Sequence, residues 1–170
     1  MTFFDDAAHA GALFSACGSY RYRLWRVWDR KLPVLFVCML NPSTAHATKL
    51  DPTTTRLVGF ARDHGFGGWV VTNLFAVKST DPKGMLTHTA PIGPENDVHL
   101  AELADAHDYV LCAWGAHGSH LGRHRHVLEL FRARGCQPLC LRVTKGGAPE
   151  HPLYLPASLR MQPYEVSRVA

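Results

Sequence analysis

An unbroken apolar run at residues 33–40 stops abruptly at the polar turn Asn41-Pro42-Ser43. A run of this length between turn residues is typical of a strand that is buried on both faces of a parallel sheet. Pro42 disfavours helical backbone at Asn41, so we expect the chain to turn out of the strand there. In open α/β sheets, ligands bind beyond the carboxyl ends of the strands, which makes Asn41 and Ser43 candidate site residues.

The alternation of apolar runs with helical segments continues along the chain and predicts an α/β fold. Further apolar runs predict core strands at residues 69–75, 108–114 and 137–143. Capping and spacing signals predict helices that begin near Asp51 and Pro94, and a helix at residues 123–134. Crossovers of this kind are right-handed and make the joined strands parallel. We therefore expect a single domain over residues 1–170, with three α/β/α layers around a central, mostly parallel four-stranded sheet.

Two N-terminal segments predict additional elements. Residues 22–28 alternate apolar and basic side chains, which is typical of a half-exposed strand. Residues 5–17 predict a first helix, with Gly18 as its C-terminal cap. We expect residues 22–28 to add an extra edge strand to the four-stranded sheet.

Composition narrows the class of protein. Hydrophobic residues at 46% and charged residues at 19% are ordinary for a globular domain. No apolar run approaches the ~20 residues of a membrane helix, and the N-terminus lacks a signal-peptide pattern, so we expect a cytoplasmic protein. The five cysteines include no Cys-x-x-Cys pair, and no Gly-x-Gly-x-x-Gly or Walker sequence follows the first core strand. We therefore expect no disulfide framework, no metal and no cofactor.

Positive charge is concentrated in the C-terminal third of the chain. Residues 109–164 contain seven Arg or Lys and two Glu, whereas the net charge of the whole chain is +4. A basic segment suits contact with phosphate groups, and a solvated helix face rich in Arg is the alternative interpretation. Four histidines of this segment are interleaved with Arg123 and Arg125, which disfavours a metal cation and favours a basic nucleic-acid face.

Three polar segments fall where predicted strands end. Asn41-Pro42-Ser43 follows the first core strand, Asn73 lies near the end of the second, and His151-Pro152 follows the last. Because the carboxyl ends of parallel strands meet at one edge of a sheet, we expect these segments to converge.

These segments resemble the motifs of the uracil-DNA glycosylase superfamily. Met39-Leu-Asn-Pro-Ser43 is similar to its first motif, which carries an Asp-Pro or Asn-Pro pair. Val71-Thr-Asn73-Leu is similar to its base-reading strand, and Val110–Gly115 is similar to its apolar strand ending in Leu-Trp-Gly. His151-Pro-Leu-Tyr-Leu155-Pro is similar to its closing His-Pro-Ser-Pro-Leu-Ser motif, so the resemblance covers residues 33–160. The chain also resembles an uncharacterised bacterial and phage family, a domain of unknown function with Asn-Pro-Ser and His-Pro motifs.

The resemblance implies a uracil-DNA glycosylase-like fold that recognises a nucleobase in DNA and excises uracil or a modified pyrimidine by hydrolysis of the N-glycosidic bond. The implied roles are catalytic for Asn41 and His151, base-binding for Asn73, Ser43 and Phe75, and DNA-binding for Leu155, Arg123, Arg125 and Lys145. The implied partner is single- or double-stranded DNA, or another nucleic acid or nucleotide. Phe60 and Tyr154 are further candidates for stacking on the base.

The chemistry of these side chains suits that implied reaction. The departing base is anionic, so a fixed donor such as His151 near its carbonyl oxygen lowers the barrier. The amide of Asn73 offers both a donor and an acceptor to the edge of an extruded base. Asn41 could position a water, although an amide does not take up its proton. An apolar Leu155 could enter the duplex as a wedge, and Arg123, Arg125 and Lys145 could contact phosphates.

Two further functional classes stay open. One is a non-catalytic module that binds nucleic acid or a nucleotide on the same fold, and the other is a hydrolase or transferase of free nucleosides or nucleotides. Ser43, His151 and Asp51 also permit a Ser-His-Asp hydrolase, but the chain has no Gly-x-Ser-x-Gly elbow to support it.

Overall fold

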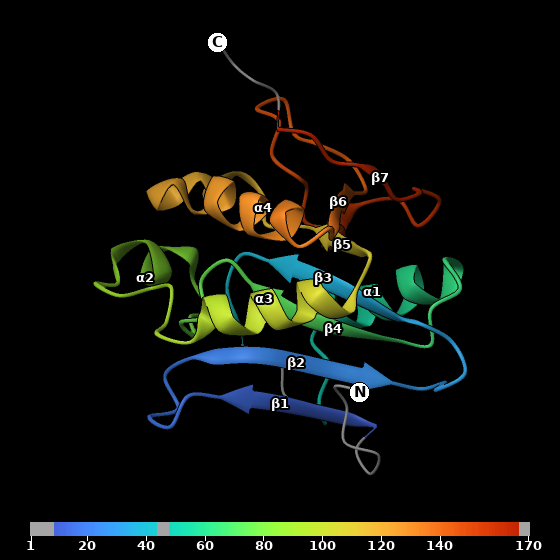
Figure 1. Cartoon of the computed structure of the whole chain (residues 1–170), viewed down its shortest axis with the longest axis horizontal. Coiled ribbons are helices and arrows are strands. Elements are labelled where there is room, and N and C mark those ends of the chain that lie inside the picture. Colours follow the sequence, from blue (N-terminus) through green and yellow to red (C-terminus); the bar gives the residue numbers. More distant parts are fainter. Residues whose placement is uncertain (1–8, 44–47, 167–170) are drawn as a thin grey trace.

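The computed structural model describes residues 9–43 and 48–166. Its strands form one seven-stranded sheet in the order β1-β2-β4-β3-β5-β6-β7 (Figure 1). The strands are β1 (Ala10–Phe14), β2 (Arg21–Val27), β3 (Val34–Met39), β4 (Gly68–Asn73), β5 (Tyr109–Cys112), β6 (Gln137–Cys140) and β7 (Gln162–Pro163). The α-helices are α1 (Pro52–Asp63), α2 (Pro82–Thr87), α3 (Asn96–Ala106) and α4 (Arg123–Ala133), and the 3-10 helices are η1 (Ala116–Gly122) and η2 (Pro152–Tyr154).

The sheet is larger than the sequence predicts. β3 pairs in parallel with β4 and β5, and β5 pairs in parallel with β6. The pairs β1–β2, β2–β4 and β6–β7 are antiparallel. The general α/β class is therefore confirmed, but a four-stranded sheet with one extra edge strand is not what forms. A mixed sheet of seven strands forms in its place.

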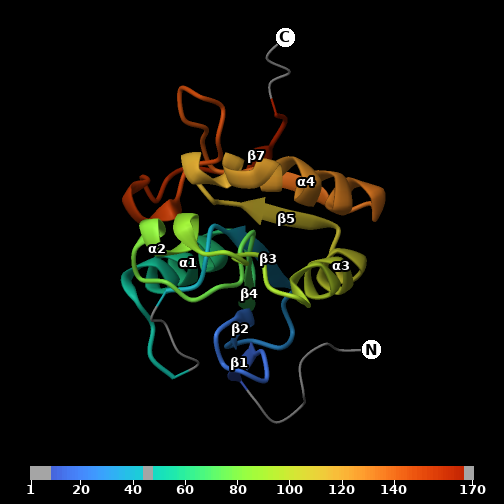
Figure 2. The same cartoon turned by 90° about the vertical axis from the view of Figure 1, so that its left-hand side faces the viewer.

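Helices cover both faces of the central strands. One core cluster joins Phe36, Cys38 and Val110 of the sheet to buried residues of α3 and α4. The other joins Val37 and Val71 to α1. These side chains alternate along each strand, so one strand supplies both faces. Figure 2 shows α1 and α3 on opposite sides of the sheet.

The prediction of a first helix at residues 5–17 is wrong. Residues 10–14 form β1, which pairs with β2 from Ala10↔Arg26 to Phe14↔Arg21, whereas residues 5–8 lie outside the described part of the chain. β2 is therefore an interior strand between β1 and β4, and its side chains are mostly buried. Because β2 offers an open row of backbone donors and acceptors, residues 10–14 complete a ladder in preference to a helical turn.

The local signal at the start of α1 is confirmed. Asp51 is the N-cap of α1: its Oδ1 accepts from the Thr54 amide at 2.7 Å, and the Thr54 hydroxyl accepts from the Asp51 amide at 2.9 Å. This reciprocal pair satisfies two donors at the start of the helix, and Pro52 follows at its first position. Within the described residues, no helix combines the length and apolarity needed to cross a bilayer.

Candidate functional site

Asn41 and Asn73 follow neighbouring parallel strands. Met39 of β3 pairs with Asn73 of β4, and the Leu74 amide donates to Met39 O at 2.9 Å. The Phe75 amide then donates to Leu40 O at 3.0 Å, so the two chains stay side by side as they leave the sheet. Asn41 is the next residue after Leu40. The predicted convergence of these two segments at the carboxyl edge is therefore what the register produces.

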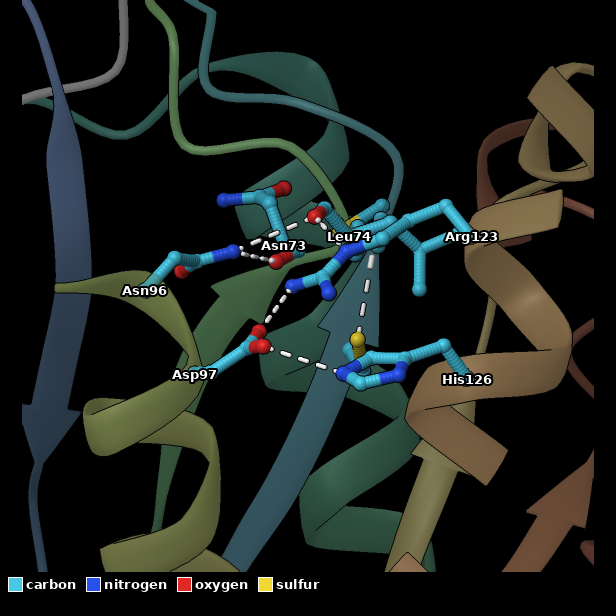
Figure 3. A network of polar contacts seen from close by, with 8 residues as sticks. Asn73, Leu74, Asn96, Asp97, Arg123 and His126 are labelled. Carbon is cyan, nitrogen blue, oxygen red and sulfur yellow. Dashed lines mark hydrogen bonds and ion pairs between the residues drawn. The ribbon is translucent and has the colours of Figure 1, made fainter. Parts of the chain in front are cut away.

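Asn73 lies on the α1 face of this edge. Val71, two residues earlier in the strand, packs in the α1 core cluster, and residues i and i+2 of a strand share a face. Asn73 as a whole residue is 3% exposed. Its side-chain amide makes no hydrogen bond to another described residue. Figure 3 shows that amide with no drawn contact to its labelled neighbours. An amide that makes no hydrogen bond to these residues is free to pair its donor and acceptor with a ligand.

Asn41 holds two loops together. Its Nδ2 donates to Pro42 O at 3.1 Å and to Ser79 O at 2.9 Å, and the Ser79 amide donates to Pro42 O at 3.0 Å. Both amide hydrogens of Asn41 are thus used inside the protein. Its Oδ1 is the atom left to accept a hydrogen bond from a water or ligand.

Asp51 links the Asn-Pro-Ser turn to α1. The Ser43 hydroxyl donates to Asp51 Oδ2 at 2.7 Å, while Oδ1 accepts from Thr54. Burial raises the pKa of Asp51, but the hydrogen bonds from Thr54 and Ser43 and the charge of Arg21 outweigh it, so the pKa lies below its ordinary value. Asp51 is therefore an anion at neutral pH and, because its oxygens are already hydrogen-bonded, a weak base.

This lowered pKa predicts an acid-dependent loss of stability that requires Asp51. A carboxylate whose pKa falls on folding contributes stability above its unfolded pKa of about 3.9, and this contribution disappears as pH falls through the folded value. Asp51→Asn keeps a capping oxygen and removes the charge. We expect the free energy of unfolding of the wild type to exceed that of Asp51→Asn at pH 7, with the gap closing below about pH 4. Urea unfolding at pH 7, 5 and 3 measures this, and a gap that is constant across that range contradicts it.

His151 directly precedes η2, which packs against α1, and it lies close enough to Asp51 to feel its charge. Its Nδ1 accepts from the Leu153 amide at 3.3 Å, which places the proton of the neutral ring on Nε2. Burial lowers the pKa of His151, and the charge of Asp51 only partly opposes this. The ring is therefore neutral at pH 7 and offers one fixed donor, Nε2–H.

Arg21 is a residue of this region that the sequence does not reveal. A register shift in the β1–β2 ladder makes Phe14 pair with Arg21 although Leu13 pairs with Arg23, so a bulge falls at Tyr22. A bulge reverses the alternation of faces, and Arg21, 4% exposed, interacts with Asp51 on the α1 side. Burial lowers the pKa of Arg21 to about 10, and Asp51 opposes this shift. The guanidinium is thus still a cation at neutral pH.

Three residues with predicted ligand contacts lie inside the protein. Phe75 is fully buried in the α3–α4 core cluster, where its ring lies 5.6 Å from that of His120. Leu155 is 2% exposed and packs in the α1 cluster, where its carbonyl accepts from Arg56. Arg123 is 3% exposed and donates to Leu74 O and to Asp97. In this conformation none of the three faces a surface that a base or phosphate could contact.

Two of the predicted phosphate-binding residues are exposed. Arg125 lies in the first turn of α4, and Lys145 lies in the turn that follows β6. That turn is joined to the end of β5 by the Gly115 amide, which donates to Pro149 O at 2.8 Å. Tyr154 of η2 is 90% exposed, three residues after His151. Lys145 thus lies beyond the carboxyl end of β6, and Tyr154 is exposed in the segment that follows His151.

The described residues form no metal-binding cluster, and a cavity at the start of β6 lies away from this edge of the sheet. Within residues 9–43 and 48–166, no group of three or more His, Cys, Asp or Glu side chains is arranged to hold a metal ion. One cavity of about 490 Å³ is lined by Gly135–Pro138 and Pro163–Val166. It lies where β6 begins, which is the opposite edge of the sheet from Asn41 and Asn73.

Comparison with known proteins identifies the family of this chain but gives no activity for it. No curated protein and no solved structure matches the chain. One family model does match, over residues 21–153, which include the two Asn residues, Asp51 and His151. The expected resemblance to an uncharacterised family is thereby confirmed. Because the model matches most of its length, the chain belongs to the family described as proteins of unknown function, DUF1643.

Proposed function

We propose that the carboxyl edge on the α1 side recognises a nucleobase in DNA and hydrolyses its N-glycosidic bond, on a fold of uracil-DNA glycosylase type. The observation that carries this proposal is the position of Asn73 at the carboxyl edge of the sheet, with a side-chain amide that makes no hydrogen bond to the described residues. An amide presents a donor and an acceptor side by side, which complements the edge of a pyrimidine. A pocket built to make such hydrogen bonds rejects ligands that lack them.

His151 supports a role in bond cleavage. When the bond from C1′ of the sugar to the base nitrogen breaks, the electron pair leaves with the base, and negative charge spreads to its carbonyl oxygens. A neutral imidazole with its proton fixed on Nε2 is a donor that needs no reorganisation to stabilise that charge. The water that attacks C1′ would be oriented by Asn41 Oδ1 and would give its proton to solvent. The carboxylate of Asp51 would stabilise the cationic sugar from a distance.

Exposed residues support a nucleic-acid substrate. Tyr154 presents an exposed aromatic face three residues after His151, and Lys145 presents a charge. Aromatic side chains bind bases by stacking, and Lys or Arg side chains neutralise phosphates. Tyr154 replaces Phe75 as the aromatic residue that we assign to stacking, because Phe75 is buried on the other face.

A second candidate is a module that binds the base without cleaving it. The specific observation in its favour concerns Asn41. Its amide nitrogen donates both hydrogens to Pro42 O and Ser79 O, and its side chain carries no group that takes up a proton. Such a site would retain base recognition by Asn73 and lose the chemistry.

Base release from synthetic oligonucleotides tests the proposal. Single- and double-stranded substrates carrying uracil, hydroxymethyluracil, hypoxanthine or a G·T mismatch are incubated with the wild type and with Asn73→Ala. We expect abasic product from at least one pyrimidine substrate and a loss of at least about 100-fold in kcat/KM for Asn73→Ala, since a base-reading pair is lost. Binding of a strand that weakens with salt but gives no abasic product would favour the binding module. Turnover of free nucleosides without affinity for DNA would contradict both.

A further inference from the structure

A pair of buried side chains from α3 and α4 meets the backbone at the end of β4. Asn96 Nδ2 donates to Asn73 O at 2.9 Å and to Leu74 O at 3.1 Å. Arg123 Nε donates to the same Leu74 O at 2.8 Å, and its Nη2 donates to Asp97 Oδ1 at 2.5 Å. Figure 3 shows these contacts converging on the two carbonyls from the two helices.

These contacts require the burial of polar and charged side chains, which costs folding free energy. Asn96 is completely buried, and its Oδ1 has no partner among the described residues, so the side chain is held there for its donor group. Arg123 keeps a cation at 3% exposure and is neutralised by Asp97, which also contacts His126 at 3.0 Å. Burying a charge is tolerated when it is paired and hydrogen-bonded, as it is here.

The need for these donors follows from the sheet. β2 pairs with β4 only from Gly68 to Val71, so the carbonyls of Asn73 and Leu74 extend beyond the last residue of that ladder. Buried carbonyls require a partner, and one donor would satisfy each of them. The protein supplies three contacts from rigid side chains on two helices, and these fix both peptide planes that follow the Asn73 side chain.

We infer that Asn96 and Arg123 are positioning residues that fix the direction in which the Asn73 amide points toward its ligand, a role that rests on the proposed function of Asn73. The two carbonyls lie on either side of the Leu74 Cα, and the Asn73 Cα–Cβ bond moves with the first of them. A site works only when its ligand-binding group is held within a fraction of an ångström. Asp97 in turn holds the guanidinium of Arg123, and His126 holds Asp97.

The test uses the full-length protein and a matched pair of variants. Arg123→Lys keeps the charge but loses the planar fork that reaches Leu74 O and Asp97 together. Arg134→Lys is the control, because Arg134 also joins α4 to α3, through Asp105 at 2.5 Å, and lies on the exposed surface. Asp97→Asn is a milder second variant, in which the amide oxygen can still accept from Arg123.

The first readout is the pair of side-chain NH₂ signals of Asn73 in a ¹⁵N-labelled sample, assigned by their absence in Asn73→Ala. We expect Arg123→Lys to shift or broaden these signals, Asp97→Asn to shift them less in the same direction, and Arg134→Lys to leave them in place. Backbone signals of α1 report whether each variant is folded. Unchanged Asn73 signals in folded Arg123→Lys would overturn the inference, and so would equal changes in Arg134→Lys.

The second readout is affinity for a single-stranded oligonucleotide that contains uracil. We expect Kd to rise about tenfold or more in Arg123→Lys and to change less than about twofold in Arg134→Lys, as displacement of a binding group by a fraction of an ångström is costly. Equal Kd in folded Arg123→Lys and wild type would overturn the inference. A wild type that binds no oligonucleotide contradicts the proposed function alone, because the Asn73 signals report its position without a ligand.

Discussion

Replacing His151 with Ala is expected to reduce the rate of base release by about 100- to 1,000-fold while leaving substrate binding nearly unchanged, because one preorganised donor to the departing base is lost. The donor is fixed by the chain itself: the Leu153 amide occupies Nδ1, so the proton stays on Nε2. His151→Gln retains a donor on a longer and more flexible side chain, and we expect an intermediate rate. Single-turnover measurement on the best substrate of the wild type separates this effect from binding.

His107→Ala is the matched control. His107 is also partly buried, burial also lowers its pKa, and its Nδ1 also contacts a backbone atom, Leu103 O at 2.8 Å. It follows α3 and precedes β5, at the opposite edge of the sheet from Asn73. We expect His107→Ala to keep the rate of the wild type. Equal losses in both variants would mean that His151 contributes only to folding.

The lowered pKa of His151 also sets the expected pH dependence. Burial disfavours the imidazolium, so the ring titrates below its ordinary value of about 6.5. The single-turnover rate should therefore be level between pH 7 and 8 and should fall only in more acidic solution, where protonation of Nδ1 breaks the hydrogen bond from Leu153. A rate that rises as pH falls from 8 to 6 would show that the cationic ring is the active form.

Most elements are predictable because their signals are local. The run at residues 33–40 predicts β3, and the Asp-Pro pair at residues 51–52 predicts the start of α1. The sequence does not predict α2 or β7, and it is wrong at β1 and β2, where the outcome depends on which strands meet. Residues 10–14 form a strand because β2 lies beside them, and β2 is interior because residues 10–14 cover it. Neither fact is contained in the pattern of either segment alone.

Some residues of the candidate site can also be predicted from local sequence signals, and others cannot. The positions of Asn41 and Asn73 at the carboxyl edge follow from the ends of apolar runs, and the prediction of His151 rests on its place after the last core strand. The sequence does not reveal Arg21, because a bulge changes the face on which a residue lies without changing the alternation of residue types. The sequence predicts Arg123 at the surface, in contact with phosphates, because basic residues of helices are usually solvated. Its burial depends on carbonyls and a carboxylate supplied by distant segments.

That burial predicts the second large effect. We expect Arg123→Ala to lower the free energy of unfolding by about 3 kcal/mol, since it leaves the carbonyl of Leu74 short of a donor and opens space between α3, α4 and the sheet. Asp97 keeps contact with solvent and with His126, so the loss should fall at the lower end of values for broken buried pairs. Urea unfolding followed by circular dichroism measures the change.

Arg134→Ala separates burial from charge. Arg134 forms an ion pair of the same length with Asp105 between the same two helices, but both side chains are well exposed. An exposed pair is worth at most about 1 kcal/mol, so the two variants should differ about threefold or more in their effect on unfolding. If Arg123→Ala costs no more than Arg134→Ala, the carbonyls at the end of β4 do not depend on Arg123, and Asn96 must then satisfy them alone. The Asn73 amide would in that case be oriented from α3, with no contribution from α4.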